Sequence, residues 1–491
     1  MLRPAVRLAL SFLMGLFVVS FLTVSAIPLH AQTMELSTYY GGSGSTSGTA
    51  IATDAAGNAF QLSYTSSSLP CSGQLTGAQN VVVTAISSGG ALGWCTYLGG
   101  TGTDYGYGIA LDARGNVYVV GMTNSPGLGT AGAYQTQLLG TDDAFVAELS
   151  PSGTLMWFTY LGTKLSSQAN SVYVDSAGGI YITGYTTGNG WPVVGDASQK
   201  TYGGGASDIV IAKLNAGGST LSWSGYLGGG GQDVGYRLAL SPNGSVACVD
   251  GYTTSSNYPT TSGAFQIAKN AVRAAVVTCL SPSTGATVAS TYFGGSTTSL
   301  QPCNACAAGL TFDASGNLWI VGLAQDETGF PITMDAEQPA YAGGLHDAFI
   351  SELPTDLTMV LYSTWFGGSE DDGAVAPAFD AEGNLWIHGN TFSQNLPVTA
   401  NAFQAKNGGP SGTSDAFLLE FSPTNNAVEY ATYLGGSEDE FGGATQSLAI
   451  GLDAIWFTGW SQSANLPLVH AFDQTLQGTQ AAFIAALKAS P

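Results

Sequence analysis

The chain has 491 residues, with 33 Asp and Glu against 11 Lys and Arg, and a net charge of −22. A surface this acidic repels nucleic acid and anionic lipid, so neither is expected as a partner. Only 9% of the residues are charged, 44% are hydrophobic and 68 are glycine. This composition excludes a disordered chain, and the glycines are expected to mark turns.

Residues 1–31 predict a signal peptide. Arg3 and Arg7 give a basic start, an apolar run follows from Leu8 to Ile27, and Leu29-His30-Ala31 is an acceptable cleavage site. The run is long enough to cross a bilayer, so an uncleaved anchor is the alternative. We expect the remainder, residues 32–491, to have no membrane span and to be secreted or held at the cell surface, with the periplasm as a further destination.

From residue 39 onward the chain repeats one unit seven times. An aromatic residue before a Gly-rich turn opens each copy, at a spacing of about 66 residues. These residues are Tyr39, Tyr97, Tyr160, Tyr226, Tyr292, Trp365 and Tyr433.

Each copy predicts four short strands joined as an antiparallel meander. In the copy that opens at Tyr97 they are Gly108–Asp112, Asn116–Gly121, Asp143–Leu149 and Leu155–Leu161, called strands A, B, C and D. Strand B is apolar on both faces, so each small sheet should be covered on both sides. Seven such units are typical of a β-propeller. A solenoid is the alternative, but its repeats are usually shorter, at about 20 to 47 residues.

The two ends of the chain predict how the ring closes. The last copy supplies strands near Ser447–Leu452, Ala454–Gly459 and Ala482–Leu487, and then the chain stops one strand short. The segment Met34–Tyr40 has the pattern of a strand D with no partners before it. We therefore predict an all-β fold: one seven-bladed propeller of four-stranded antiparallel blades, closed by the N-terminal strand in the last blade.

A spaced set of motifs resembles the SBBP repeat of bacterial extracellular proteins. The motifs are YLGG-x-x-x-D-x-G, D-x-x-G-N-x-[YW], an apolar residue before proline, A-[FY]-Q, and D-A-F, and together they span roughly Met34 to Leu487. The fourth copy has Ser241-Pro242-Asn243-Gly244 in place of D-x-x-G-N, and the seventh copy loses that motif. The resemblance implies a bacterial, extracellular seven-bladed propeller and no shared catalytic residues or ligand.

Six cysteines suit an oxidising compartment. Cys248 and Cys279 fall on neighbouring strands of one blade, and Cys71 and Cys95 belong to the first copy, so each pair predicts a disulfide. Cys303 and Cys306 form a C-x-x-C pair in a loop. A metal site there would need two further ligands, which are missing nearby in sequence, so a small disulfide is favoured.

Several recurring residues have a structural explanation that needs no ligand. Asp and Gly of the D-x-x-G-N turns, such as Asp112 and Gly115, should hold a tight turn, with calcium binding as the alternative. The aspartates that open strand C should contact backbone. The aromatic residues near the start of strand B should pack between blades, with a sugar platform as the alternative. They are Phe60, Tyr118, Tyr181, Trp319, Trp386 and Trp456.

The D–A and B–C connections are predicted to be long and to share one face of the ring, where function is expected. The B–C loops carry an apolar residue before proline, which is expected to tuck under its loop, with an exposed rim as the alternative. The D–A loops carry acids that could bind Ca²⁺ or a cationic partner, or could form a solvated acidic surface. The candidate residues are Asp104, Asp233, Glu370, Asp371, Asp372, Glu438, Asp439 and Glu440.

The sequence favours a non-catalytic extracellular binding scaffold over an enzyme. No nucleophile, metalloprotease or nucleotide-binding motif is present in the sequence. We expect a monomer that binds a glycan or a protein through its loop face and needs no cofactor other than a possible Ca²⁺. The alternative is a secreted polysaccharide hydrolase or lyase with acids at the central opening, for which Asp371 and Asp439 are candidates.

Overall fold

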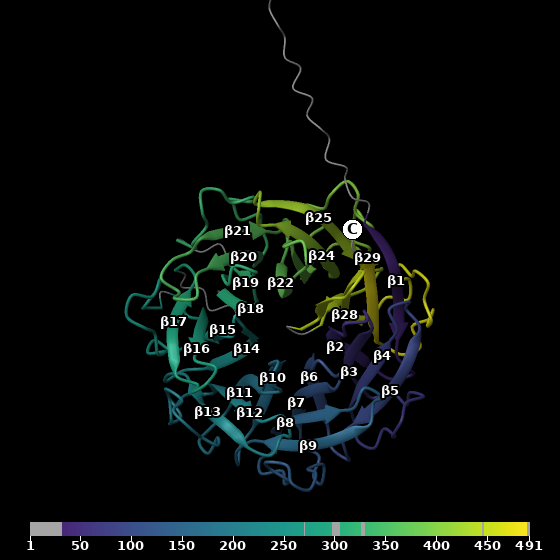
Figure 1. Cartoon of the computed structure of the whole chain (residues 1–491). Coiled ribbons are helices and arrows are strands. Elements are labelled where there is room, and N and C mark those ends of the chain that lie inside the picture. Colours follow the sequence, from purple (N-terminus) through teal and green to yellow (C-terminus); the bar gives the residue numbers. More distant parts are fainter. Residues whose placement is uncertain (1–31, 270, 297–304, 326–328, 444–445, 489–491) are drawn as a thin grey trace, which may run out of the picture. The chain divides into compact units, whose positions relative to one another are not determined.

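Short antiparallel strands joined by turns make up the computed structural model, which describes residues 32–269, 271–296, 305–325, 329–443 and 446–488. The predicted signal peptide lies outside these residues. From Gln32 onward the chain forms one unit, in which seven sheets surround a central channel as the blades of a propeller (Figure 1). The predicted fold is confirmed. The described residues include no helix long and apolar enough to cross a bilayer.

Each blade runs from an innermost strand A to an outermost strand D, and blades 1 to 7 follow chain order. The innermost strands are β2 (Thr46–Thr53), β6 (Asp104–Leu111), β10 (Ser167–Val174), β14 (Asp233–Leu240), β18 (Ala305–Phe312), β22 (Asp372–Phe379) and the pair β26 (Glu440–Gly442) and β27 (Leu448–Ile450). The second strands are β3 (Ala59–Thr65), β7 (Val117–Thr123), β11 (Ile180–Thr186), β15 (Ala247–Thr253), β19 (Leu318–Ala324), β23 (Leu385–Thr391) and β28 (Ala454–Ser461).

The third and fourth strands form the outer half of each blade. The third strands are β4 (Asn80–Ile86), β8 (Asp143–Leu149), β12 (Asp208–Leu214), β16 (Ala274–Leu280), β20 (Asp347–Leu353), β24 (Asp415–Ser422) and β29 (Ala481–Lys488). The outermost strands are β5 (Leu92–Leu98), β9 (Leu155–Leu161), β13 (Leu221–Leu227), β17 (Thr287–Phe293), β21 (Tyr362–Phe366), β25 (Ala427–Leu434) and β1 (Thr33–Tyr40).

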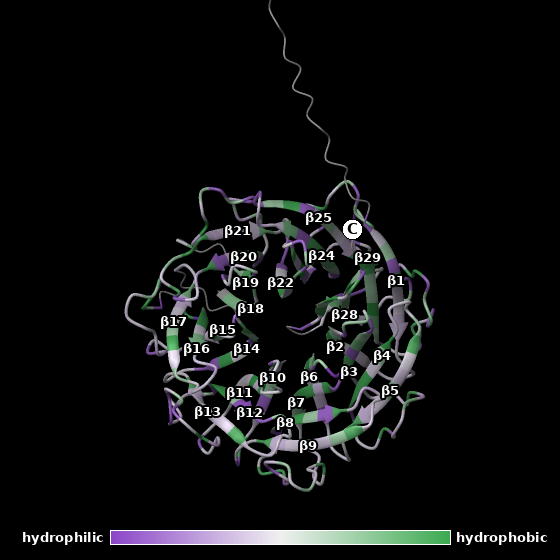
Figure 2. Ribbon diagram, in the orientation of Figure 1, coloured by the Kyte–Doolittle hydropathy of each residue, from purple (hydrophilic) through white to green (hydrophobic). Residues whose placement is uncertain are grey.

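The ring closes as predicted. Strand β1 pairs antiparallel with β29, from Met34 opposite Leu487 to Tyr40 opposite Ala482, and supplies the outermost strand of blade 7 (Figure 1). The strands carry most of the hydrophobic residues (Figure 2), and their side chains form core clusters that join neighbouring blades. The second-strand aromatics are buried in this packing, which confirms their structural interpretation.

Six of the seven D–A connections are five residues long, so the prediction of long ones was wrong for these six blades. The connection from β17 to β18 has eleven residues. The innermost strand of blade 2 begins at Asp104 rather than Gly108, and Asp104 and Tyr105 already pair with Thr123 and Met122 before a bulge. Glycine is needed here for packing rather than for a turn, because a Cβ on Gly106 would lie 2.9 Å from the side chain of Leu62 in blade 1.

The tyrosine of the YLGG motif is hydrogen-bonded to the B–C loop that carries the proline. In blade 2 the Tyr160 hydroxyl accepts the N–H of Leu128 at 2.9 Å and donates to the Ser125 carbonyl at 2.6 Å. The same tyrosine position holds the N–H of the residue before proline in five other blades. The pairs are Tyr97–Leu69, Tyr226–Trp191, Tyr292–Tyr258, Tyr433–Leu396 and Tyr39–Leu466. These apolar residues are buried, which confirms that they tuck under their loops.

Replacing Tyr160 by Phe should lower the free energy of unfolding by about 1 to 3 kcal/mol, because a partly buried N–H and a buried carbonyl lose their partner. Urea denaturation of both proteins measures the difference. Tyr134→Phe is the matched control, since no hydrogen bond within the described residues involves the Tyr134 hydroxyl. Equal stability of the Tyr160→Phe variant and the parent would contradict this role.

The long B–C loops run along the outer wall of the ring instead of standing on one face. In blade 2 the Tyr160 N–H of β9 donates to the Gln135 carbonyl at 3.0 Å, and Thr130 N–H donates to the Phe158 carbonyl at 3.0 Å. The Gln135 side chain donates to Asp143 and accepts the Gly162 N–H. The A-[FY]-Q motif therefore covers the free edge of the outermost strand.

The recurring aspartates contact backbone, as predicted. Asp112 accepts the N–H groups of Arg114 and Asn116, both at 2.9 Å, and Gly115 has a φ of 80°. Asp143 at the start of strand C accepts the N–H groups of Leu139 and Gly140. The aspartates of the D-x-x-G-N turns and those at the start of strand C therefore have structural roles within the blades.

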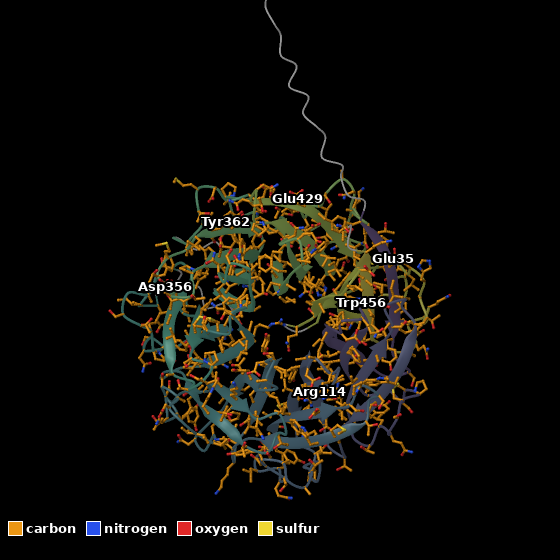
Figure 3. The ribbon with its side chains drawn as sticks, in the orientation of Figure 1. Glu35, Arg114, Asp356, Tyr362, Glu429 and Trp456 are labelled. Carbon is orange, nitrogen blue, oxygen red and sulfur yellow. A yellow bond between two sulfur atoms is a disulfide. The ribbon has the colours of Figure 1, made fainter. Side chains whose placement is uncertain are left out.

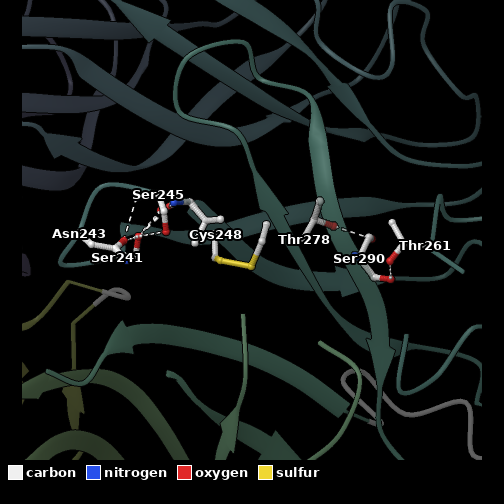
Figure 4. Close-up of a disulfide and its surroundings, with 9 residues drawn as sticks. Ser241, Asn243, Ser245, Cys248, Thr261, Thr278 and Ser290 are labelled. Atoms are coloured by element: carbon white, nitrogen blue, oxygen red, sulfur yellow. Dashed lines mark hydrogen bonds between the residues drawn. A yellow bond between two sulfur atoms is a disulfide. The ribbon is translucent and has the colours of Figure 1, made fainter. Parts of the chain in front are cut away.

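Two of the three predicted disulfides are present. Cys71 bonds to Cys95, and Cys248 of β15 bonds to Cys279, which lies directly opposite on β16 (Figure 4). In blade 4 a turn held by Ser241 replaces the D-x-x-G-N turn, and Cys248 stands where other blades have an aromatic residue. The third predicted pair includes Cys303, which lies outside the described residues.

Candidate binding site at the mouth of the central channel

Four of the eight predicted acids open innermost strands and are buried: Asp104, Asp233, Asp372 and Glu440. Asp104 accepts the Gly100 N–H at 2.9 Å and the Ser125 hydroxyl at 3.0 Å, and it also bonds to the Thr123 hydroxyl. Asp233 makes the corresponding bonds in blade 4. The acid of YLGG-x-x-x-D thus holds the Gly-rich turn in place.

The other four acids lie in the D–A connections of blades 6 and 7. Asp371 accepts the His346 N–H at 3.2 Å, and Asp439 accepts the Ser414 N–H at 2.9 Å, so each is bonded to a loop of the preceding blade. Glu370 and Glu438 are exposed. No three His, Cys, Asp or Glu side chains of the described residues cluster as a metal site. Ligand or Ca²⁺ binding by these acids stays a prediction.

One position near the end of each second strand escapes full burial in most blades. It lies between a small residue, usually Gly, and a Thr, Ser or Ala, while the surrounding strand residues are buried. The residues at this position are Tyr64, Met122, Tyr185, Tyr252, Leu323, Asn390 and Trp460. Their partners on the innermost strands are Ser47, Tyr105, Gln168, Val234, Cys306, Gly373 and Phe441. The second-strand member of every pair is the next-to-last residue of its strand, just before the B–C loop begins.

Aromatic rings gather at these positions and in the neighbouring bulges. Tyr64 of blade 1 meets Tyr105 of blade 2 edge to face at 5.0 Å, and Tyr105 stacks with the bulge residue Tyr107 at 6.1 Å. In blade 4, Tyr236 lies 5.7 Å from Tyr252. We define the aromatic mouth as Tyr64, Tyr105, Tyr107, Tyr185, Tyr236, Tyr252, Phe392, Phe441 and Trp460, the last three grouped by ring contacts in blades 6 and 7.

Three tyrosines of the mouth, Tyr107, Tyr185 and Tyr236, offer neutral hydroxyl groups at ordinary pH. Burial raises the pKa of Tyr107, Tyr185 and Tyr236 above its usual range. The Tyr185 hydroxyl donates to the Gln168 side chain at 3.1 Å. Within the described part of the chain, no hydrogen bond involves the hydroxyls of Tyr64, Tyr105 and Tyr107. These three hydroxyls are therefore able to bond to a ligand.

Of two arginines in blade 4, Arg273 places positive charge beside the tyrosines, whereas the charge of Arg237 interacts with Asp250. Arg237 lies in the β14 bulge, and burial lowers the pKa of its guanidinium to about 10, so it remains charged at neutral pH. Its backbone N–H donates to Asp250 at 2.8 Å, and burial raises the pKa of that carboxyl to about 7. The Arg273 guanidinium lies 4.2 Å from the ring centre of Tyr252, a cation–π contact.

Gln446 closes the channel below the mouth. Its backbone carbonyl accepts the Ile51 N–H of blade 1 at 2.9 Å, and its side-chain amide donates to the Val172 carbonyl of blade 3 at 3.1 Å. Gly108, which faces the Gln446 side chain, is three positions after Tyr105, so the mouth extends about 10 Å along β6.

His388 is a packing residue between two blades. Its Nδ1 lies 2.9 Å from the Ser447 hydroxyl, and both side chains are fully buried between blades 6 and 7. Burial lowers the pKa of His388 to about 3, so the ring is neutral. With no access from solvent, this Ser–His pair joins two blades and does not form a nucleophilic site.

The aromatic mouth was missed by the sequence interpretation, which assigned function to acids and loop residues. The available signal was the variable residue between Gly and Thr in segments such as Gly184-Tyr185-Thr186 and Gly251-Tyr252-Thr253. Successive side chains of a strand point to opposite faces, so this residue shares a face with the buried aromatic four residues earlier. This variable residue is partly exposed because it lies where the interface between two blades opens into the mouth of the channel.

Comparisons with known proteins agree with this architecture. Residues 93–127 and 157–190 match the SBBP beta-propeller repeat. The chain carries SBBP repeats at these two places. No match was found among curated proteins.

Solved structures similar to this SBBP-repeat chain include three from different organisms. Hydrazine synthase from Kuenenia stuttgartiensis is 9% identical, over 85% of this chain and 94% of that chain, with a TM-score of 0.44. The Pan2 WD40 domain of Neurospora crassa is 9% identical over 94% and 96%, with a TM-score of 0.43. A protein of unknown function from Dyadobacter fermentans is 8% identical over 93% and 99%, with a TM-score of 0.41. These similarities assign no ligand or activity to this chain.

Proposed function

We propose that this SBBP-repeat propeller is a non-catalytic binding protein that takes a glycan at its aromatic mouth. The observation that carries the proposal is the continuous contact of partly exposed tyrosines at the channel opening, from Tyr64 through Tyr105 to Tyr107. Tyr185, Tyr236 and Tyr252 continue this lining into blades 3 and 4.

The chemistry of the mouth suits a sugar chain. Aromatic rings pack against the apolar faces of sugar rings, while tyrosine hydroxyls and arginine side chains can hydrogen-bond to sugar hydroxyls. Sites for small ligands typically combine such an apolar lining with a few polar groups that fix orientation. The two disulfides favour an oxidising compartment, where extracellular glycans occur. Secretion therefore forms part of the proposal.

Binding should be weakened by removing two rings from the mouth. Tyr64→Ala combined with Tyr105→Ala should lower the affinity for the bound polysaccharide at least tenfold, because truncating an aromatic anchor commonly costs more than about 1 kcal/mol. The measurement is retention of the protein, from Gln32 onward, on cellulose, chitin, xylan, starch and alginate, with and without Ca²⁺. Tyr173→Ala is the control, because Tyr173 lies on the innermost strand β10 at its opposite end.

The same assay separates binding from catalysis through released reducing ends. Retention without products, lost in the double variant only, supports the proposal. Products would support the alternative of a hydrolase or lyase, and would direct substitution to Asp371 and Asp439. Equal retention of the double variant and the parent would place the glycan elsewhere, and no retention on any polysaccharide would contradict glycan binding.

A further inference from the structure

A cavity of about 260 Å³ lies between blades 7 and 1, at the end of the ring opposite the mouth. The C–D turn of blade 1, at Gly90, closes one side, and Leu36, Trp456 and Ala486 line the interior. Glu35 and Trp456, which both belong to blade 7 (Figure 3), line this cavity. This is the junction where the two ends of the propeller chain meet.

The cavity exists because blade 7 has small residues where blade 2 has large ones. In blade 2, Trp157 of β9 pairs with Glu148 of β8, and the indole N–H of Trp157 donates to the Glu148 carboxylate. In blade 7 the corresponding pair is Leu36 of β1 and Ala486 of β29. An indole and a carboxylate are thus replaced by an isobutyl group and a methyl group.

Blade 7 also lacks the aspartate that accepts the indole N–H of the second-strand tryptophan in other blades. In blades 5 and 6 the second-strand Trp319 and Trp386 donate to Asp313 and Asp380 of the D-x-x-G-N turn, at 3.3 and 2.9 Å. Blade 7 has Gly451 at the position of that aspartate, and its turn is one residue shorter. In the part of the chain that the structure describes, no hydrogen bond involves the Trp456 indole N–H.

Charged groups of both signs surround the opening of the cavity. Glu35, Asp453 and Lys488 are exposed, and none of them forms an ion pair with another described residue. His470 is held over the cavity by a bond from its Nδ1 to the Glu35 carbonyl at 2.9 Å, and by the neighbouring Val469, which pairs with Ser37.

We propose that this cavity binds a free α-amino acid with an apolar side chain. The side chain would occupy the apolar interior against Leu36 and Ala486, and a cavity of about 150 Å³ already accepts benzene, so a branched or aromatic side chain fits the volume. The ammonium group is matched by Glu35 and Asp453, and the carboxylate by Lys488 and the Trp456 indole N–H. The proposal is independent of the glycan site, which lies at the other end of the channel.

Calorimetric titration with L-leucine, L-phenylalanine, L-tryptophan and L-serine tests the ligand class. At least one apolar amino acid should bind with a Kd below about 1 mM, equivalent to roughly −4 kcal/mol. Phenethylamine and 3-phenylpropionate, which each lack one of the two charged groups, should bind at least tenfold more weakly than phenylalanine. Equal affinity of these analogues, or no binding of any amino acid, would overturn the proposal.

Two variants test the location. Leu36→Trp combined with Ala486→Glu rebuilds the filled interior of blade 2, and it should abolish amino-acid binding while the circular dichroism spectrum is kept. Lys488→Gln should weaken binding at least fivefold without affecting folding, and Lys200→Gln, at an exposed loop position, is its matched control. Binding that survives both changes would contradict the site. The Tyr64→Ala and Tyr105→Ala changes at the mouth should leave amino-acid binding unaltered.

Discussion

A chain that begins at Gly41 instead of Gln32 should fail to form a stable monomer. Strand β1 pairs along the length of β29, and its Leu36, Tyr39 and Tyr40 side chains are each no more than 5% exposed. Burying a large apolar side chain contributes about 1.5 to 3 kcal/mol, so these three residues alone supply a large part of a typical total stability of about 5 to 15 kcal/mol. Size-exclusion chromatography and thermal unfolding measure the loss.

Adding the missing strand in trans provides the control. A synthetic peptide of residues 32–42 should bind the shortened chain by β-strand addition and raise its melting temperature. A peptide of the same composition in scrambled order should have no effect. If the shortened chain melted at the temperature of the longer chain, ring closure by β1 would contribute little to stability.

The propeller should be more stable at pH 5 than at pH 8. Three fully buried carboxyl groups, Asp208, Asp250 and Asp415, have their pKa raised from 3.8 to about 7, chiefly by burial. The folded state therefore binds more protons than the unfolded state between about pH 4 and pH 7. Stability falls as the pH rises through this window and levels off above it. A shift of three units corresponds to about 4 kcal/mol per group.

Urea denaturation at pH 5, 6, 7 and 8 measures this dependence. Asp415→Asn removes one of the titrating groups and should flatten the profile, with the largest gain in stability at pH 8. Asp196→Asn is the matched control, because the Asp196 side chain is 84% exposed. A parent protein that became more stable from pH 5 to pH 8 would contradict the expectation.

The fold was predictable because its determinants are local and repeated seven times. Turns such as Asp112 to Asn116 specify their own geometry, and counting strands in the last copy showed that Met34–Tyr40 was needed there. The lengths of the D–A connections were not predictable, because the glycines at 106 and 108 sit in a bulged strand where neighbouring blades approach closely.

The sites were less predictable because they depend on contacts between blades. Partial exposure of Tyr64 depends on Tyr105 of the next blade, 41 positions later. The cavity depends on Leu36 and Ala486, which come from opposite ends of the chain. The buried acids Asp104 and Asp233 have the sequence context of loop residues. Only the pairing of β6 with β7 and of β14 with β15 places these acids inside the strands.

Each outermost strand is hydrogen-bonded along its free side by the B–C loop of its own blade, as at Gln135, Gln266 and Gln404. Two copies of this molecule pressed together would therefore meet through side chains and not through backbone groups. Templated growth into fibrils requires an open backbone edge onto which the next chain can be added. Crowding many copies into a small volume should thus leave each propeller separate and folded.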